Sequence, residues 1–445
     1  MKNHLIPKTL VLSLSMLGLP LAAQASEAAL LKRIEKLAAE LEQVKAELQA
    51  TKQKTDVVEQ KQEVLIARPV PVAPAPIIVQ TAPAPVVTAT APVSSTPQTV
   101  ITGYGEINYN RPKDASQAQA DVRRAVIGLQ HRFDDKTKLV TEFEWEHAIV
   151  SADDSGESEV EQIYIEREFD NGLRAKGGLF LIPLGLLNTN HEPTAYYGVE
   201  RNFIETAIIP STWREAGASV SSTMDNGLTW DAGLTTGFNL TKWDAAGTDG
   251  LESPLGSIHQ EGQLAKSRDL SVFGALNWRG VPGLLLGGGI FTGKAGHKTA
   301  GFAANDARVT LWDLHARYNL GAWDLSALYA RGTISNTDAI NLTLVGNPTL
   351  IPASFQGWYA QAAYALWQSG NYKLSPFIRY EQYNTAKSYA SLPAGLGNSS
   401  GPDEKVTTLG ANLWLSEGVV LKADYQKFRQ DKTRDRLDLG IAYSF

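Results

Sequence analysis

The sequence predicts an all-β transmembrane barrel of 16 antiparallel strands, preceded by an N-terminal α-helical coiled coil. Three observations lead to this prediction. From residue 99 onward, apolar and polar residues alternate in stretches of about ten, the length of a tilted strand that crosses a bilayer. Short turns rich in Asp, Asn and Gly alternate with longer polar connections. Before this region, apolar residues recur every seven positions.

Residues 1–25 are predicted to be an export signal that is cleaved after Ala25. Lys2 and Lys8 give a positive start, an apolar run follows, and the last three residues, Ala-Gln-Ala, have the small-x-small pattern of a signal peptidase site. A short membrane anchor is the alternative, but the run is shorter than the roughly 20 apolar residues that a spanning helix needs. We therefore expect the mature chain to leave the cytoplasm.

The composition restricts the possible functions. The 445 residues include no Cys, so an exported form has no disulfides and depends on a large cooperative fold. The formal net charge of -6 argues against a nucleic-acid partner. No Gly-rich phosphate loop and no pair of His residues at metal-ligand spacing is present. We therefore expect no enzyme, with no catalytic residues, no metal site and no cofactor.

Residues 26–67 form the predicted coiled coil. Leu30, Leu37 and Val44 lie seven residues apart, and Ile34 occupies the complementary seam position. The β-branched Ile34 and Val44 at both seam positions favour a trimer over a strict dimer. A single amphipathic helix that lies on the barrel or on peptidoglycan is the alternative.

Residues 68–98 are rich in Pro, Ala, Val and Thr and form a predicted linker. Such a composition adopts an extended polyproline-type path of about 3 Å per residue and cannot fold alone. We expect a semi-rigid spacer that joins the coiled coil to the barrel on its periplasmic side.

Residues 99–445 form the predicted outer-membrane barrel. In the last strand Leu437, Leu439 and Ile441 share one face, and Asp438 lies on the other. A charge that faces the bilayer midplane costs about 2 to 4 kcal/mol, so the charged face is predicted to line a wet bore. An even number of strands leaves both ends on the periplasmic side. A soluble β-sandwich, which also alternates, is the alternative fold.

Aromatic residues near strand ends, such as Trp323 and Trp414, are predicted at the lipid–water interface.

Residues 183–212 interrupt the alternation. This stretch follows a strand, shows neither a helix nor a strand period for about thirty residues, and ends where a strand resumes at Trp213. A structureless insertion of that length in a compact domain is usually functional. We interpret it as a loop that folds into the bore and constricts the pore.

Four motifs resemble the phosphate-selective porin O and P family, over roughly residues 100 to 445. They are Arg123-Arg124-Ala125, the run from Gly178 to Pro183, Glu200-Arg201, and the run from Pro210 to Gly217. The resemblance implies a trimeric porin of sixteen strands in the bacterial outer membrane, whose third external loop folds into the channel. It also implies passive diffusion of small hydrophilic solutes or anions.

Candidate pore-lining residues lie in that loop and on the strands beside it. They are Arg124, Glu142, Glu144, Arg174, Lys176, Tyr196, Arg201 and Arg214. Each charged member also has a structural interpretation, which is pairing with an opposite charge on a neighbouring strand. Arg123 and Arg124 cannot both face the bore on a regular strand, so one pairs at a rim or the strand is bulged.

A phosphate channel needs fixed Arg or Lys donors, because the anion gives up its hydration shell. By strand phase, acidic and basic residues are balanced in the predicted bore. We therefore expect a general or weakly anion-preferring porin. A phosphate- or polyphosphate-selective channel is the alternative, with Arg124, Arg174, Lys176, Arg201 and Arg214 as its lining. A third possibility is a structural envelope tether, in which the coiled coil binds peptidoglycan and the barrel is an anchor in outer-membrane lipid.

Overall fold

The structure is a computed structural model that describes residues 98–393, 395–396 and 400–445, together with Lys45. The predicted signal peptide and coiled coil, and the linker up to residue 97, therefore lie outside the described residues except at Lys45.

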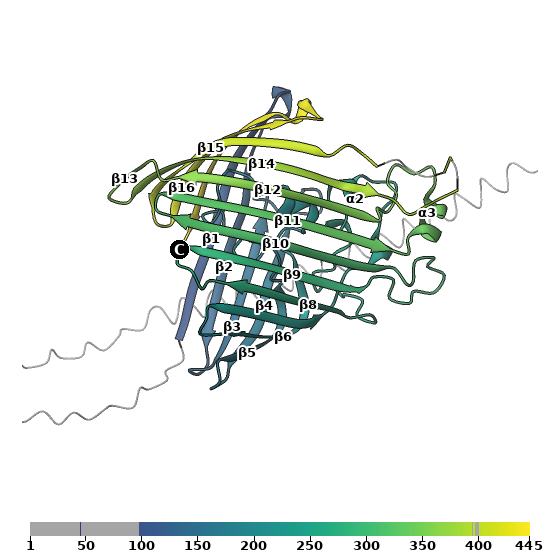
Figure 1. Ribbon diagram of the computed structural model, residues 1–445, viewed down its shortest axis with the longest axis horizontal. Coiled ribbons are helices and arrows are strands. Elements are labelled where there is room, and N and C mark those ends of the chain that lie inside the picture. The colour runs from purple at the N-terminus through teal and green to yellow at the C-terminus, as the bar shows by residue number, and fades with distance from the viewer. Residues whose placement is uncertain (1–44, 46–97, 394, 397–399) are drawn as a thin grey trace, which may run out of the picture. The chain divides into compact units, whose positions relative to one another are not determined.

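The described chain forms one antiparallel sheet that closes on itself (Figure 1). The sheet has 17 strands, and β1 pairs with both β2 and β17. One of them, β13, has only three residues and extends the hairpin between β12 and β14, which also pair directly. Sixteen full-length strands therefore form the barrel wall, and the predicted barrel of 16 antiparallel strands is confirmed.

The strands are β1 (Gln98–Pro112), β2 (Gln119–Arg132), β3 (Thr137–Glu146), β4 (Ser158–Glu168), β5 (Leu173–Leu181), β6 (Arg214–Thr223), β7 (Leu228–Thr235), β8 (Ser271–Trp278), β9 (Leu284–Lys294), β10 (Arg308–Leu320), β11 (Trp323–Ser335), β12 (Ser354–Tyr364), β13 (Trp367–Ser369), β14 (Tyr372–Ser388), β15 (Glu404–Ser416), β16 (Val419–Phe428) and β17 (Arg436–Ser444).

Short helical turns occupy the long connections. They are η1 (Ala115–Gln117), η2 (Ile204–Ile208), η3 (Leu240–Lys242), α2 (Asp249–Glu252), η4 (Gly256–Ile258), α3 (Asp338–Leu344) and η5 (Lys432–Arg434). Among the described residues, no helix has the length and apolar character needed to cross a membrane.

Tight turns and long connections alternate around the barrel and lie at opposite ends. In Figure 1 the C-terminus and the β13 hairpin lie at the left end, whereas α2 and α3 lie at the right. The tight turns contain residues suited to reversal: Gly227 has a φ of 81°, and the side chain of Asn226 accepts a hydrogen bond from the backbone of Leu228 at 3.0 Å. One end of the barrel therefore has only short turns, and the other end has the long connections.

The two faces of the wall differ in polarity. On β17, Leu437, Leu439, Ile441 and Tyr443 are exposed on the outer face, while Asp438 between them is buried inside. Strands around the barrel repeat this arrangement, so apolar side chains cover the outside. Because a charge on a lipid-facing position costs about 2 to 4 kcal/mol, this outer surface is suited to a bilayer.

A bulge in β2 accommodates the Arg pair of the second strand. Glu106 pairs with Arg124 but Ile107 pairs with Val122, which leaves Arg123 as the extra residue. Arg124 is buried and faces inward, next to Glu106. The bulged-strand interpretation of the two arginines is therefore confirmed.

A second bulge, in β4, breaks the strict alternation there. Glu142 pairs with Gln162 but Phe143 pairs with Val160, so Glu161 is the extra residue. Glu161 and Gln162 are consequently both buried although they are adjacent in sequence. The bulge thus directs an additional carboxylate into the interior.

A dry apolar cluster fills part of the interior. Trp213 stacks on Phe238, and Phe291 packs edge-to-face against both, with centroid distances of 4.6 to 5.5 Å; all three are at most 1% exposed. Ile204 and Ile208, from the loop of residues 183–212, belong to the same cluster. One side of the bore is therefore packed like a protein core rather than wet.

One aromatic prediction is wrong. Trp414 packs inside the barrel against Tyr197, with ring centroids 5.8 Å apart, instead of lying at the lipid–water interface. The side chain lies on the same face of β15 as the buried Thr408 and Asn412. Strand phase overrides the general preference of Trp for an interface.

Candidate functional site

The loop of residues 183–212 lies inside the barrel. The backbone N–H of Val199 donates to Asp424 on β16 at 2.7 Å, and that of Phe203 donates to Glu381 on β14 at 2.7 Å. These wall carboxylates are buried and face inward. The loop leaves the wall after β5 and returns at β6, so these bonds tie it to the far side of the bore.

Glu205 holds the shape of the loop. Its carboxylate accepts hydrogen bonds from the backbone N–H groups of Leu186 and Leu187, both at 2.6 Å, from Asn202 at 2.8 Å, and from the hydroxyl of Tyr359 at 3.2 Å. Burial raises the pKa of Glu205, while the bonds from Asn202 and the two backbone groups favour its ionised form. The residue joins both halves of the loop to β12.

Arg201 is engaged within the loop. Its guanidinium donates to the hydroxyl of Ser211, to that of Thr212 at 2.8 Å, and to the backbone carbonyl of His191 at 3.0 Å. The residue is 7% exposed. Arg201 therefore fixes one part of the loop to another.

Arg214 is also surrounded by protein partners. It forms ion pairs with Glu159 and, at 3.2 Å, with Glu261, and it donates to the carbonyl of Thr212 at 3.2 Å. Burial disfavours ionisation of Glu261, but His259 at 3.0 Å and the charge of Arg214 outweigh it and lower the pKa of Glu261. This network links β6 to β4 and to the connection 236–270.

Arg124 lies among carboxylates on neighbouring strands. Its guanidinium is 3.0 Å from Glu106, 3.1 Å from Glu144 and 3.3 Å from Glu146. The hydroxyl of Tyr196 donates to the other oxygen of Glu106 at 3.2 Å. Arg124 thus neutralises the charge of acidic groups in the part of the wall that the loop contacts through Tyr196.

Arg174 and Lys176 on β5 are only half buried. The ammonium of Lys176 lies 5.3 Å from the ring centre of Tyr164 and 5.2 Å from that of Phe180, within cation–π range. Arg174 lies opposite Glu168 on β4 in the strand register. Of the predicted basic residues, these two retain the most access to the interior space.

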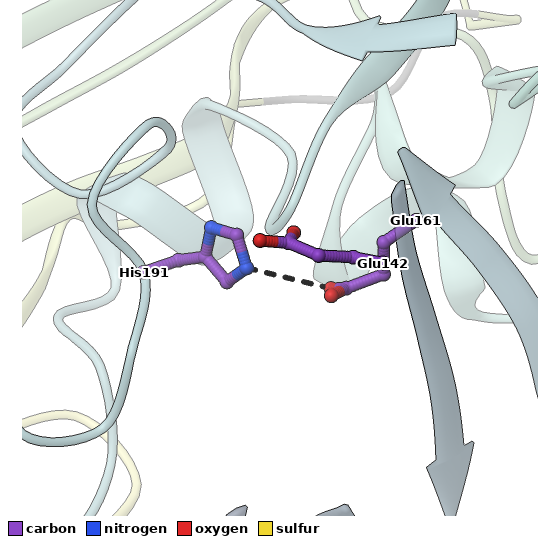
Figure 2. Close-up of side chains that lie close together, drawn as sticks. All are labelled: Glu142, Glu161 and His191. Carbon is purple, nitrogen blue, oxygen red and sulfur yellow. Dashed lines mark ion pairs between the residues drawn. The ribbon is translucent and has the colours of Figure 1, made fainter. Parts of the chain in front are cut away.

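An acidic cluster with a histidine lies between the loop and the wall (Figure 2). Glu142 on β3 and the bulge residue Glu161 on β4 face His191 of the loop, and their ligand atoms all lie within 4.8 Å of one another. The hydroxyl of Tyr104 is 2.6 Å from both Glu161 and the Nε2 atom of His191. Tyr104, Glu161 and His191 are buried.

Two larger cavities lie on opposite sides of the loop. One has about 530 Å³ and is lined by loop residues, by the tight turn around residues 279–283, and by His315 and Arg317. The other has about 810 Å³ and is lined by Phe203 and by the long connections around residues 251–253 and 401–404. The loop therefore separates a space near the short turns from a space near the long connections.

A third cavity lies beside the loop and shares Leu186 and Arg317 with the cavity of about 530 Å³. This small cavity of about 30 Å³ is lined by Tyr197, Arg317 and Arg379, among others. Arg317 pairs with Asp324 at 2.6 Å, and Arg379 pairs with Glu381 at 2.9 Å and donates to the carbonyl of Tyr197 at 3.2 Å. A space of this size holds little more than a water molecule.

The predicted site residues fall into separate groups. One group is connected through the loop–wall contacts: Arg124, Glu142, Glu144, Tyr196 and Arg201. Lys176 and Arg174 lie apart on β5, and Arg214 lies on β6. Whether any of them contacts a solute stays a prediction.

Sequence reasoning missed Glu161 as a site residue, because strict alternation places it outside. A signal was present in the spacing of the apolar residues of this strand. Val160, Ile163 and Ile165 are all exposed on the outer face, and the three-residue step from Val160 to Ile163 marks the bulge.

No protein-family model matches the chain. An uncharacterized protein of Aquifex aeolicus (strain VF5) is 28% identical over 357 residues, which cover 78% of this chain and 79% of that protein. The Salmonella typhi OmpF in complex with daunomycin matches 78% of this chain and 97% of its own, with a TM-score of 0.56 and 14% identity.

Two further solved structures are similar. They are the outer membrane channel DcaP of Acinetobacter baumannii, with a TM-score of 0.49, 11% identity and coverage of 78% and 97%, and an anion-selective porin from Comamonas acidovorans, with a TM-score of 0.47, 13% identity and coverage of 79% and 100%. The resemblance to the phosphate-selective porin O and P family stays a prediction. The TM-score of 0.56 shows that this chain shares the barrel fold of OmpF, and at 14% identity the likeness shows the fold alone.

Proposed function

We propose that this chain is a bacterial outer-membrane porin that lets small hydrophilic solutes and ions diffuse passively through a bore narrowed by the loop of residues 183–212. The observation that carries the proposal is the loop inside a closed barrel, with a cavity on each side of it. The apolar outer face provides the surface for lipid, and the polar interior provides the path. A homotrimer with both termini in the periplasm is part of the proposal and follows from the predicted strand count and heptads.

A weak anion preference is the finer part of this proposal. The cavity of about 530 Å³ is lined by Arg279, His315 and Arg317, and its described lining includes no Asp or Glu. The opposite cavity, in contrast, includes Glu252, Glu404 and Arg434. Arg317 is paired with Asp324 and His315 with Asp313, whereas Arg279 forms no ion pair in the described part of the chain. The guanidinium of Arg279 is therefore the fixed positive charge that would favour an anion over a cation in this cavity.

Electrical recording of the purified full-length protein in a planar bilayer tests both parts. We expect discrete conductance steps and a reversal potential under a KCl gradient that reports a modest anion preference. We also expect a larger conductance for Tyr197→Ala, because this loop residue lines the small cavity of about 30 Å³ and its truncation enlarges the space there. Trp367→Ala, on the exposed β13, is the matched aromatic control and should leave the conductance unchanged.

Absence of conductance from correctly folded protein would contradict the porin. A cation-leaning reversal potential would remove only the anion preference. Block of the current by low concentrations of phosphate would instead favour the phosphate-selective channel.

A further inference from the structure

Three side chains from separate segments meet beside the loop: Glu142 from β3, Glu161 from the bulge of β4, and His191 from the loop of residues 183–212 (Figure 2). We propose that they form a binding site for a divalent cation of the Zn²⁺ type, which links the loop to the wall. The inference is independent of the porin function, since it rests on the cluster alone.

The buried carboxylate of Glu161 lacks a Lys or Arg partner in the described part of the chain. Glu161 is 0% exposed, and its Oε1 atom has no hydrogen-bond partner, although it lies 3.5 Å from Nε2 of His191. In the described part of the chain, neither Glu142 nor Glu161 forms an ion pair with Lys or Arg. The nearby Arg124 is paired with other carboxylates. Buried charges in proteins are paired or coordinate metals.

The hydrogen bonds of His191 orient its free nitrogen toward the carboxylates. Its Nδ1 atom lies 3.2 Å from the backbone carbonyl of Asn188, which only accepts, so Nδ1 carries the proton. In the neutral ring, Nε2 is then an acceptor that faces the carboxylate of Glu161. Tyr104 has one hydroxyl proton to donate to either atom. A cation between Nε2 and the carboxylate satisfies both acceptors.

The donor set indicates the class of metal. One imidazole nitrogen with two carboxylate oxygens suits Zn²⁺ and similar transition ions, whereas Mg²⁺ and Ca²⁺ prefer oxygen ligands throughout. A backbone carbonyl that holds the other ring nitrogen is the usual outer-shell arrangement of a metal-binding histidine, and Asn188 supplies it here. Gln162, which donates to Glu142 at 2.6 Å, orients one carboxylate in the same way.

The competing explanation is a protonated His191 that forms an ion pair with Glu161 and binds no metal. Calorimetric titration of Zn²⁺ into the full-length protein, purified in detergent and treated with EDTA, separates the two. We expect one class of saturable site near neutral pH, and binding weakened at least about tenfold by Glu161→Gln and by His191→Gln. Mg²⁺ at the same concentration should not compete.

Matched controls come from the same molecule. Glu166→Gln removes another carboxylate of β4, which pairs with Lys138, and His131→Gln removes a histidine at the end of β2. Both should bind Zn²⁺ like the unaltered protein. Equal binding by His191→Gln or Glu161→Gln would overturn the proposal.

A measurement without variants covers the case in which they do not fold. Zn²⁺ should raise the temperature at which the unaltered barrel unfolds, relative to EDTA, and Co²⁺ should give a visible absorption band of mixed nitrogen and oxygen ligation. If the folded protein takes up neither Zn²⁺ nor Co²⁺, the cluster is only an imidazolium–carboxylate pair and the proposal fails.

Discussion

Arg124 illustrates how single charges are accommodated inside this wall. The side chain is 8% exposed and lies within 3.3 Å of carboxylates on three positions of β1 and β3. The opposite charges stabilise one another, because burial of any one of them alone would cost several kcal/mol in lost hydration. The contribution of Arg124 is therefore greater than that of a surface cation.

Arg124→Met tests this at the residue scale. We expect the barrel to lose about 3 to 5 kcal/mol of stability, because Glu106, Glu144 and Glu146 are left without their cation. Urea titration of protein folded in lipid vesicles, followed by gel mobility, measures the loss. Arg132→Gln, at the exposed end of the same strand, should change the stability little, and an equally small effect of Arg124→Met would contradict the compensation.

Arg124 could be predicted from the sequence as an interior residue, but the carboxylates that surround it could not. Its place beside Arg123 and the alternation of β2 indicate an inward-facing residue or a bulge, and the structure contains the bulge. Glu161 and His191, in contrast, are 30 residues apart and on different kinds of segment. Their meeting depends on a bulge and on the path of an irregular loop, and neither follows from residue periodicity.

The loop of residues 183–212 owes its position to apolar packing as well as to hydrogen bonds. Its π-helical turn, η2, contributes Ile204 and Ile208 to a cluster with Trp213, Phe238 and Phe291. Burial of such large side chains gives about 1.5 to 3 kcal/mol each. The loop is therefore part of the folded core rather than a flexible insertion.

Trp213→Ala tests this packing at the scale of the element. Trp213 is 0% exposed, and its removal should cost about 3 to 5 kcal/mol through lost contacts and the cavity left behind. Thermal unfolding followed by far-UV circular dichroism measures the change. Trp367→Ala, 49% exposed on β13, should be near neutral; a similar loss for both would indicate that the cluster adds no specific stability.

For this element, sequence reasoning recognises the interruption but not its interior packing. The missing period after Pro183 indicates a loop, and the resumption near Trp213 agrees with β6, which begins at Arg214. The apolar cluster combines residues of this loop with Phe238 from the connection 236–270 and with wall strands. Contacts between two irregular segments leave no pattern along the chain.

The wall as a whole follows from its alternation, and this is why its strand count was predictable. A one-residue shift would turn every apolar side chain inward, so each strand between two turns has one acceptable phase. Leu439, 43% exposed on β17, represents the outer face.

Leu439→Lys tests the lipid-facing surface. We expect a loss of about 2 to 4 kcal/mol in vesicles, because a charge at this face must enter the hydrocarbon. Reversible urea titration in bilayers provides the measurement. Leu264→Lys makes the same change at a residue that is 99% exposed in the connection 236–270 and should be tolerated; equal costs at both sites would argue against a bilayer around the barrel.

The attachment of the internal loop has a consequence for the order of folding. Val199 bonds to Asp424, 225 residues later, and Thr194 bonds to Ser444, 250 residues later. These bonds cannot form until β16 and β17 are in place, and contacts between such distant residues are slow to form. The loop therefore reaches its final position only when the last strand closes against β1. Resistance of this loop to a protease would thus be a signal of completed assembly.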